Sequence, residues 1–288
     1  MFLWETIAQR LSAATGRSFE FAGQSQLGGG SINRATVVQG RDGRRYFVKF
    51  NRRDALPMFE AEAEGLRELA RTATLRVPIP VNVGNAENEA FLILEYLELT
   101  GVENSAQLGR GLAALHRTTQ SRFGWHRDNT IGSTPQINTW NDDWVVFFRE
   151  QRLAFQLRFT DGALRELGEQ LLERLPIFFR GYRPIASLLH GDLWSGNTGA
   201  TRDGAAVIFD PAVYYGDREA DIAMTELFGG FAHAFYDAYR EAWPLDAGYA
   251  TRKTLYNLYH VLNHHRLFGG GYATQAGRMM RQLLSEAR

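Results

Sequence analysis

The sequence predicts an α+β protein with a small, β-rich N-terminal lobe and a larger, mainly helical C-terminal lobe. Residues 19–50 alternate β-branched segments with turn residues, which favours strands. After residue 97 the apolar residues recur mostly at helical spacing. A chain of 288 residues is long enough for two lobes. We therefore expect a nucleotide-binding lobe over residues 1–97 and a helical lobe with the catalytic and metal loops over residues 98–288.

Local patterns predict the elements of each lobe in turn. Apolar residues four apart predict a helix over residues 3–14, and Pro57 suits the first turn of a second helix that runs to about residue 71. Residues 19–50 are expected to form strands and turns, with strands over residues 34–39 and 46–50, and further strands are expected over residues 77–83 and 90–96. In the second lobe the spacing predicts helices over residues 105–118, 140–159, 163–175, 219–242 and 251–266.

Composition excludes several classes of function. Lys+Arg and Asp+Glu both number 32, so bulk electrostatic capture of nucleic acid or an anionic membrane is not expected, although a local basic patch stays open. The absence of cysteine excludes disulfides, thiolate catalysis and cysteine-based zinc sites. The N-terminus does not resemble a signal peptide, and no stretch of 18 apolar residues occurs. We therefore expect a cytoplasmic protein with neither a nucleic acid nor a membrane partner.

The strongest chemical signal lies in the eight residues from His190 to Asn197. Asp192 precedes Asn197 by five residues, and Asp210 follows a short apolar strand. This spacing is typical of the catalytic and metal loops of kinase-like phosphotransferases. A carboxylate can accept or orient the proton of a substrate hydroxyl, and amide and carboxylate oxygens suit Mg²⁺. We predict Asp192 as the catalytic base and Asn197 and Asp210 as Mg²⁺ ligands, rather than three unrelated cap and turn residues.

A glycine-rich segment is a candidate for covering nucleotide phosphates. Gly28, Gly29, Gly30 and Ser31 lie between two predicted strands, and glycines let backbone N–H groups approach phosphate closely. A dinucleotide-binding loop would lead into a helix, whereas a strand is predicted here. The alternative is a simple turn without a ligand.

A lysine and a glutamate are candidates for the pair that positions nucleotide phosphates. Lys49 lies in a predicted strand, and Glu62 falls inside the apolar stripe of the helix after Pro57. A carboxylate on a buried face needs a cationic partner, so we predict a Lys49–Glu62 pair, as in kinases. The alternatives are an exposed edge lysine and a glutamate that reaches water. The backbone of Glu95, Tyr96 and Leu97, where the lobes join, is expected to bind adenine.

Two departures from protein kinases indicate a small-molecule acceptor. Gly191 replaces the arginine of H-R-D, which reads a phosphorylated activation loop, so such regulation is not expected. Trp194 stands two residues after the catalytic aspartate, where serine/threonine kinases commonly carry lysine. An indole offers a flat apolar face that suits a sugar ring or its aglycone, so we predict a substrate contact for Trp194.

These motifs together resemble those of the fructosamine/ketosamine-3-kinase family. The His-Gly-Asp core of His190 to Asn197 is shared by aminoglycoside and choline kinases. Its Trp-Ser-Gly-Asn continuation is typical of far fewer families. Other matching segments are residues 28–33, 58–62, 134–140, 147–153, 210–212, 214–217 and 227–231. The resemblance covers essentially the whole chain.

The resemblance implies a protein-kinase-like fold and ATP-dependent phosphorylation of the sugar 3-hydroxyl of ketosamines, which are adducts of sugars on amines. Because the 3-phosphate destabilises the adduct, it also implies a role in deglycation of free or protein-bound ketosamines. The roles carried over are those already assigned to Asp192, Asn197, Asp210, Lys49, Glu62 and the Gly28–Ser31 loop. Many eukaryotic members carry cysteine where this chain has Ser31, so we expect a monomer without a disulfide-linked dimer.

Several further residues lie around these motifs. Asp217 is predicted to contact the substrate, and Asp221 either braces the catalytic loop, as in related kinases, or caps a helix. Trp140 and Trp144 are one helical turn apart and are expected to pack rather than to form a substrate platform. His116 ends an apolar helix and is expected to be structural.

Two other functions stay open. A kinase of another small hydroxyl compound, such as an aminoglycoside or a choline-like amine, would share the catalytic motif. An aminoglycoside site should present converging acids, for which the candidates are Asp142, Asp143, Asp161, Asp217 and Glu219. A non-catalytic nucleotide-binding module is less consistent with intact Lys49, Asp192, Asn197 and Asp210.

Overall fold

The computed structural model describes residues 3–26, 32–102 and 104–287. Its contacts divide the chain into two compact units. The first unit comprises Met1–Glu103 and Gly199–Phe209, and the second comprises Asn104–Thr198 and Asp210–Arg288. The first unit thus includes a segment that the expected boundary after residue 97 assigns to the second lobe.

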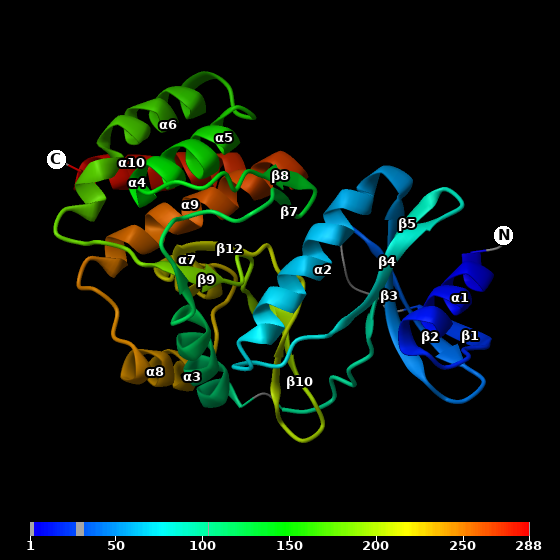
Figure 1. Cartoon of the computed structure of the whole chain (residues 1–288). Helices are drawn as coiled ribbons and strands as arrows, with labels where there is room; N and C mark the ends of the chain where they lie inside the picture. The colour runs from blue at the N-terminus through cyan, green and yellow to red at the C-terminus, as the bar shows by residue number, and fades with distance from the viewer. Residues whose placement is uncertain (1–2, 27–31, 103, 288) are drawn as a thin grey trace. The chain divides into compact units, whose positions relative to one another are not determined.

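The first unit is built on a five-stranded antiparallel sheet with strand order β1-β2-β3-β5-β4 (Figure 1). Its strands are β1 (Phe21–Gln26), β2 (Arg34–Gly40), β3 (Arg45–Arg52), β4 (Pro80–Ala86) and β5 (Glu89–Glu95). Helix α1 (Leu3–Thr15) buries Ile7 and Leu11 against Phe50, Phe91 and Ile93 of the sheet. This burial of apolar area is the main stabilisation of the unit.

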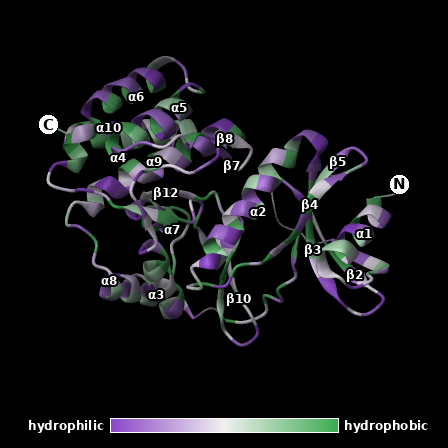
Figure 2. Cartoon of the chain, in the orientation of Figure 1, coloured by the Kyte–Doolittle hydropathy of each residue, from purple (hydrophilic) through white to green (hydrophobic). Residues whose placement is uncertain are grey.

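Helix α2 (Leu56–Arg71), preceded by the short η1 (Arg53–Ala55), packs on β4 and β5. Pro57 lies in its first turn, where a missing N–H breaks no helical hydrogen bond. Its buried face includes Phe59, Leu66 and Leu69. In Figure 2 the helix carries both hydrophilic and hydrophobic residues, as expected of an amphipathic helix. A two-stranded sheet of β10 (Thr198–Ala200) and β11 (Ala206–Ile208) adds to this unit through a bridge from Val207 to Arg76.

The second unit is mainly helical. Its helices are α3 (Ser105–His116), α4 (Trp144–Phe147), η2 (Phe148–Leu153), α5 (Ala154–Leu157), α6 (Gly162–Arg174), η3 (Leu175–Phe179), η4 (Ser195–Asn197), α7 (Glu219–Thr225), α8 (His233–Ala242), α9 (Tyr249–Phe268) and α10 (Tyr272–Glu286). Helix α3 lies beside α8, and α9 packs against α7 and α10 (Figure 1). The mixed α+β class predicted from the sequence is confirmed.

Short strands in the second unit carry the loops that matter for function. Strands β12 (Tyr214–Asp217), β9 (Ala186–Leu189) and β6 (Thr119–Gln120) form one antiparallel sheet. Strands β7 (Asn129–Ile131) and β8 (Thr134–Gln136) form a separate hairpin.

Two helix predictions for this unit need correction, and one helix was missed. The helix expected over residues 140–159 begins only at Trp144, because Asp143 caps it through a hydrogen bond from the Val146 N–H, and its middle is the π-helical η2. The helix expected over residues 219–242 is broken into α7 and α8, with Gly229 and Gly230 at positive φ between them. Helix α10 was not predicted.

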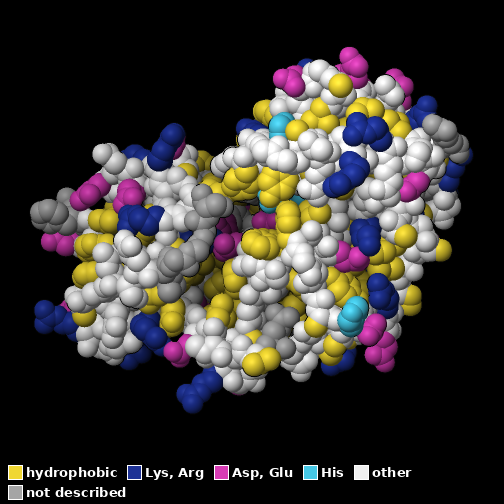
Figure 3. Space-filling view, turned by 180° about the vertical axis from the view of Figure 1, so that it is seen from behind, with side chains coloured by type: hydrophobic (Ala, Val, Ile, Leu, Met, Phe, Trp, Pro, Cys, Tyr) yellow, Lys and Arg dark blue, Asp and Glu magenta, His cyan; other side chains and the backbone are white. Residues whose placement is uncertain are grey.

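Charged side chains of both signs are interspersed on the face seen in Figure 3. No helix in the described part of the chain is long and apolar enough to cross a membrane.

Candidate active site

Asp192 and Asn197 lie in one loop that leaves the buried strand β9. The Asn197 side-chain amide donates to the backbone carbonyl oxygen of Asp192 at 2.8 Å and to the carboxylate Oδ2 of Asp192 at 3.3 Å. The short η4 turn, closed by a 2.9 Å bond from the Asn197 N–H to the Trp194 carbonyl, brings the two residues together. Because the Asn197 amide nitrogen is engaged, its amide oxygen is the atom that could bind a cation.

Asp210 follows β11 and is exposed, with a left-handed φ of 58°. Burial, together with the negative charge of nearby Asp210, raises the pKa of the Asp192 carboxyl to about 7. No cluster of three or more His, Asp and Glu side chains in the described ranges could hold a metal ion. A cation site would combine the Asp210 carboxylate with the Asn197 amide oxygen, hard-oxygen donors that suit Mg²⁺, and a bound cation would offset the repulsion between Asp192 and Asp210.

Gly191 allows the catalytic loop to pass close to the segment after Asp210. Its φ is +82°, and a Cβ at this position would lie 2.0 Å from the Ala212 carbonyl oxygen. The Ala212 N–H donates to the His190 carbonyl oxygen at 2.8 Å. A side chain at Gly191 would push the two loops apart, which gives a local reason why the arginine of H-R-D is absent.

Asp221 braces the catalytic loop from the first turn of α7. The backbone N–H groups of His190 and Gly191 donate to its two carboxylate oxygens at 2.7 and 2.9 Å. Burial opposes ionisation, but the hydrogen bond and charge of His116, the charge of His190 and the hydrogen bond from the Gly191 N–H outweigh it and lower the pKa of Asp221 below its ordinary value. The residue at the helix cap is Arg218, so the capping alternative for Asp221 is wrong.

His116 joins this brace to a second helix. One ring nitrogen lies 3.1 Å from Asp221 Oδ2, and the other lies 2.8 Å from the Tyr239 hydroxyl. Arg218 Nη1 donates to the same hydroxyl at 3.0 Å. The expected structural role of His116 holds, but the sequence analysis did not connect it to Asp221, which lies 105 residues away.

Asp217 is fully buried at the end of β12. The Tyr182 and Tyr256 hydroxyls and the Glu219 N–H donate to its carboxylate. Glu219 is also buried and pairs with Arg252. This arrangement favours a structural role for Asp217 over the predicted substrate contact. It also removes two of the acids that an aminoglycoside site would have to present.

Trp194 lies on an aromatic surface of the second unit, with 36% of its area exposed. Its ring centre is 6.0 Å from that of Phe228, which lies 4.8 Å from the His264 ring. Tyr272 follows at 5.2 Å from His264. The indole also covers Gly196, where a Cβ would lie 2.3 Å from a ring atom. Phe228, His264 and Tyr272 were not predicted, because their alignment with Trp194 depends on helix packing.

The predicted tryptophan packing is borne out in part. Trp144 is buried in α4 and donates its indole N–H to the Tyr256 hydroxyl at 3.1 Å. Trp140 precedes the helix and packs near Tyr215, with ring centres 6.2 Å apart.

Lys49 and Glu62 form the predicted ion pair within the first unit. The Lys49 ammonium lies 2.6 Å from Glu62 Oε1, and both side chains are largely buried. Lys49 lies in β3, between β2 and β5, and Glu62 lies in α2. The sheet thus fixes the lysine backbone, and the helix supplies the counter-charge.

The other predicted nucleotide-binding residues are those of the glycine-rich segment and the stretch after β5. Gly28, Gly29, Gly30 and Ser31 lie outside the described residues. Glu95 ends β5, pairs with Arg76 through its side chain, and donates its backbone N–H to the Ile79 carbonyl oxygen at 2.9 Å. Tyr96 and Leu97 follow, both half-buried.

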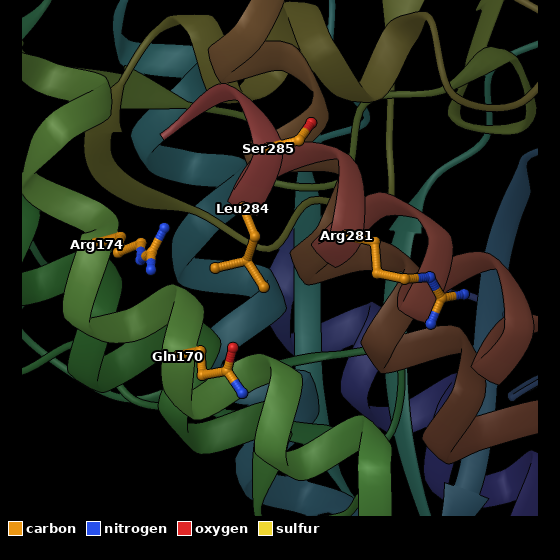
Figure 4. Close-up of a pocket in the computed structure, with 5 residues that line it drawn as sticks. All are labelled: Gln170, Arg174, Arg281, Leu284 and Ser285. Atoms are coloured by element: carbon orange, nitrogen blue, oxygen red, sulfur yellow. The ribbon is translucent and has the colours of Figure 1, made fainter. Parts of the chain in front are cut away.

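A separate groove lies between α6 and α10 (Figure 4). It is lined by Gln170, Arg174, Arg281, Leu284 and Ser285. None of these residues belongs to the predicted site.

The chain matches the model of the family described as fructosamine kinase over residues 3–286. A relative from Synechocystis sp., named probable ketoamine kinase, is 46% identical, with 98% of this chain and 97% of the relative covered. A chloroplastic protein-ribulosamine 3-kinase from Oryza sativa subsp. indica is 44% identical over 91% of this chain and 78% of its own.

Solved structures show the same likeness in three dimensions. The crystal structure of a candidate fructosamine-3-kinase from Haemophilus somnus is 30% identical, with a TM-score of 0.89 and 98% and 97% of the two chains covered. A choline kinase from Streptococcus pneumoniae is 13% identical with a TM-score of 0.61, covering 99% of each chain, and shares the fold. The kinase-like fold implied by the sequence is therefore confirmed.

Proposed function

The chain belongs to the fructosamine kinase family and is an ATP-dependent phosphotransferase, and we propose that its acceptor is the sugar 3-hydroxyl of a ketosamine. The product would be a 3-phosphorylated adduct, and the role would be deglycation. The single observation that carries this proposal is the Asp192–Asn197 loop beside Asp210, in a chain 44% identical to a protein-ribulosamine 3-kinase.

In this proposal Asp192 accepts or orients the proton of the acceptor hydroxyl. A partly buried carboxyl with a raised pKa is a stronger proton acceptor than a fully solvated one. Asn197 and Asp210 would hold Mg²⁺, which when bound supplies positive charge to the phosphates of ATP. Asp221 keeps the loop backbone in place while the proton moves.

The nucleotide would be bound by residues of the first unit. We assign Lys49, oriented by Glu62, to the phosphates of ATP, because the ion pair holds its ammonium in place. The Gly28 to Ser31 segment would cover the phosphates, and the backbone from Glu95 to Leu97 would bind adenine.

The acceptor would lie against the exposed indole of Trp194. Phe228 and His264 extend this surface, which suits the apolar face of a sugar or the carbon chain of its amine. Direct recognition by Asp217 is not part of this proposal, because its carboxylate is buried and takes three internal donors. We further propose a cytoplasmic monomer that acts on free or protein-bound ketosamines.

The test is ATP turnover with ribulosamine, erythrulosamine, fructosamine, kanamycin and choline, with the phosphorylated position identified by NMR. We expect turnover of the ketosamines with phosphate on the 3-oxygen. Turnover confined to kanamycin or choline would identify a kinase of another small hydroxyl compound instead.

A further inference from the structure

Two buried amide side chains of the β7–β8 hairpin contact the backbone that follows Asp210. Asn129 and Gln136 are opposite each other in the hairpin, and the Gln136 amide donates to Asn129 Oδ1 at 2.9 Å. Gln136 also donates to the Ala212 carbonyl oxygen at 3.0 Å, and Asn129 donates to that of Val213 at 2.8 Å. The carbonyl oxygens of Ala212 and Val213, which follow Asp210, thus accept hydrogen bonds from side chains rather than from the backbone of a neighbouring β-strand.

The amide oxygens of Gln136 and Asn129 also take part in hydrogen bonds. The Tyr259 hydroxyl donates to Gln136 Oε1 at 2.8 Å, and the Asn138 amide donates to Asn129 Oδ1 at 2.9 Å. An amide whose nitrogen donates to an acceptor and whose oxygen accepts from a donor has one favoured orientation. The network therefore fixes which group faces the Ala212 and Val213 carbonyls.

Arg152 orients the network from the π-helical segment η2. Its side chain is fully buried, and Nη2 donates to Asn138 Oδ1 at 2.7 Å. Its guanidinium lies 4.1 Å from the centre of the Tyr214 ring. Its partners among the described residues are carbonyl oxygens and aromatic rings, with no carboxylate. The cation forces the Asn138 oxygen towards itself, so that the Asn138 nitrogen faces Asn129.

The backbone from Asp210 to Val213 carries the predicted metal ligand Asp210 and also contacts the loop that carries Asp192. Asp210 has a left-handed φ of 58°, a conformation that L residues other than Asn and Asp rarely adopt. Ala212 donates its N–H to His190, and its carbonyl packs against Gly191. A shift of the Ala212 backbone would therefore move Asp210 relative to the loop that carries Asp192.

We infer that Gln136 and Asn129, oriented by Arg152 and Tyr259, are positioning residues that set the direction of the Asp210 carboxylate for its cation. The inference rests on the proposed function, in which Asp210 binds a divalent cation. Residues that orient metal ligands typically change metal affinity by about 10- to 100-fold when they are altered.

The experiment measures the binding of Mn²⁺–ADP by water proton relaxation enhancement. Mn²⁺ is a paramagnetic probe that replaces Mg²⁺, and the signal distinguishes protein-bound Mn²⁺–ADP from Mn²⁺–ADP in solution. Gln136→Glu keeps the side-chain shape and removes the donor to Ala212. We expect it to weaken Mn²⁺–ADP binding roughly 10- to 100-fold, with ADP affinity in EDTA, measured by calorimetry, changed less than about twofold.

Two further variants make the result specific. Tyr259→Phe removes only the hydroxyl that holds Gln136 and should weaken Mn²⁺–ADP binding roughly fivefold, the weight of one hydrogen bond. Gln151→Glu is the matched control, because Gln151 also donates its amide to a backbone carbonyl, that of Thr139, at 2.8 Å. It should bind Mn²⁺–ADP like the unaltered protein.

The outcomes separate this inference from the function on which it rests. If the unaltered protein gives no enhancement, the cation role of Asp210 fails and the inference fails with it. Normal binding by folded Gln136→Glu, or an equal loss in Gln151→Glu, overturns the positioning role alone. If Gln136→Glu does not fold, wild-type affinity in Tyr259→Phe overturns it.

Discussion

The catalytic loop of the second unit and the Lys49–Glu62 pair of the first are held in different ways. Both N–H groups of His190 and Gly191 depend on one buried carboxylate, that of Asp221. The backbone of Lys49 is paired with β2 and β5, and only its side chain needs a partner. An irregular loop must find side-chain partners for its backbone groups, whereas a central strand already has them. The loop should therefore be the more sensitive of the two to changes in distant side chains.

The largest effect on kcat is expected for a change in the catalytic loop itself. Asp192→Ala removes the group assigned to the acceptor proton and should lower kcat by about 10²- to 10⁴-fold. Nucleotide binding should persist, since the residues assigned to ATP are unchanged. Steady-state kinetics with a ribulosamine and calorimetry with ADP provide the measurements. Near-normal turnover would remove Asp192 as the base.

The second prediction tests the brace. Asp221→Asn replaces one accepting oxygen by an NH₂ group that faces a backbone N–H, so both stability and rate should fall. We expect a loss of about 2 kcal/mol in the free energy of unfolding and up to about a 10²-fold loss in kcat through misplacement of Asp192. Urea unfolding and kinetics measure the two effects.

Asp246→Asn is the matched control for the brace, because Asp246 is an exposed acid paired with Arg252 and has no contact with the loop in the described residues. It should leave kcat nearly unchanged. A variant Asp221→Asn that is destabilised but turns over normally would show that the brace serves stability alone.

The smallest effects on kinetics and stability are expected for a change at Lys49. Lys49→Met should raise the KM for ATP by about tenfold, equivalent to about 1.4 kcal/mol of lost binding. In the double variant Lys49→Met, Glu62→Leu, which leaves no unpaired charge, the loss in unfolding free energy should be smaller than for Asp221→Asn, because the β3 backbone stays paired. Kinetics over a range of ATP concentrations and urea unfolding test this order. A larger stability loss than that of Asp221→Asn would reverse the comparison.

Local spacing made the central residues predictable. Asp192 and Asn197 are five residues apart in one loop, and their hydrogen bond needs only a short turn. The Lys49–Glu62 pair was predictable because a carboxylate within an apolar helical stripe needs a nearby cation. For Asp221 the sequence left two interpretations, since a helix cap and a loop brace both need an acid near a helix start.

The supporting residues were missed because their partners are distant in sequence. Gln136 is 76 residues from Ala212, and Asn129 is 84 residues from Val213. One signal was present: Gln136 and Asn138 alternate along an extended segment and so share a face. Nothing local indicates that this face would meet the backbone after Asp210.

The sequence by itself determined the α+β class, the kinase-like motif and its family, because these depend on residue type and short spacing. Only the tertiary structure decided that Asp217 is buried, that His116 supports Asp221 and that two amides hold the segment after Asp210. The physical reason is that burial and hydrogen-bond partners of irregular backbone are chosen by packing between elements, on which local sequence carries little information.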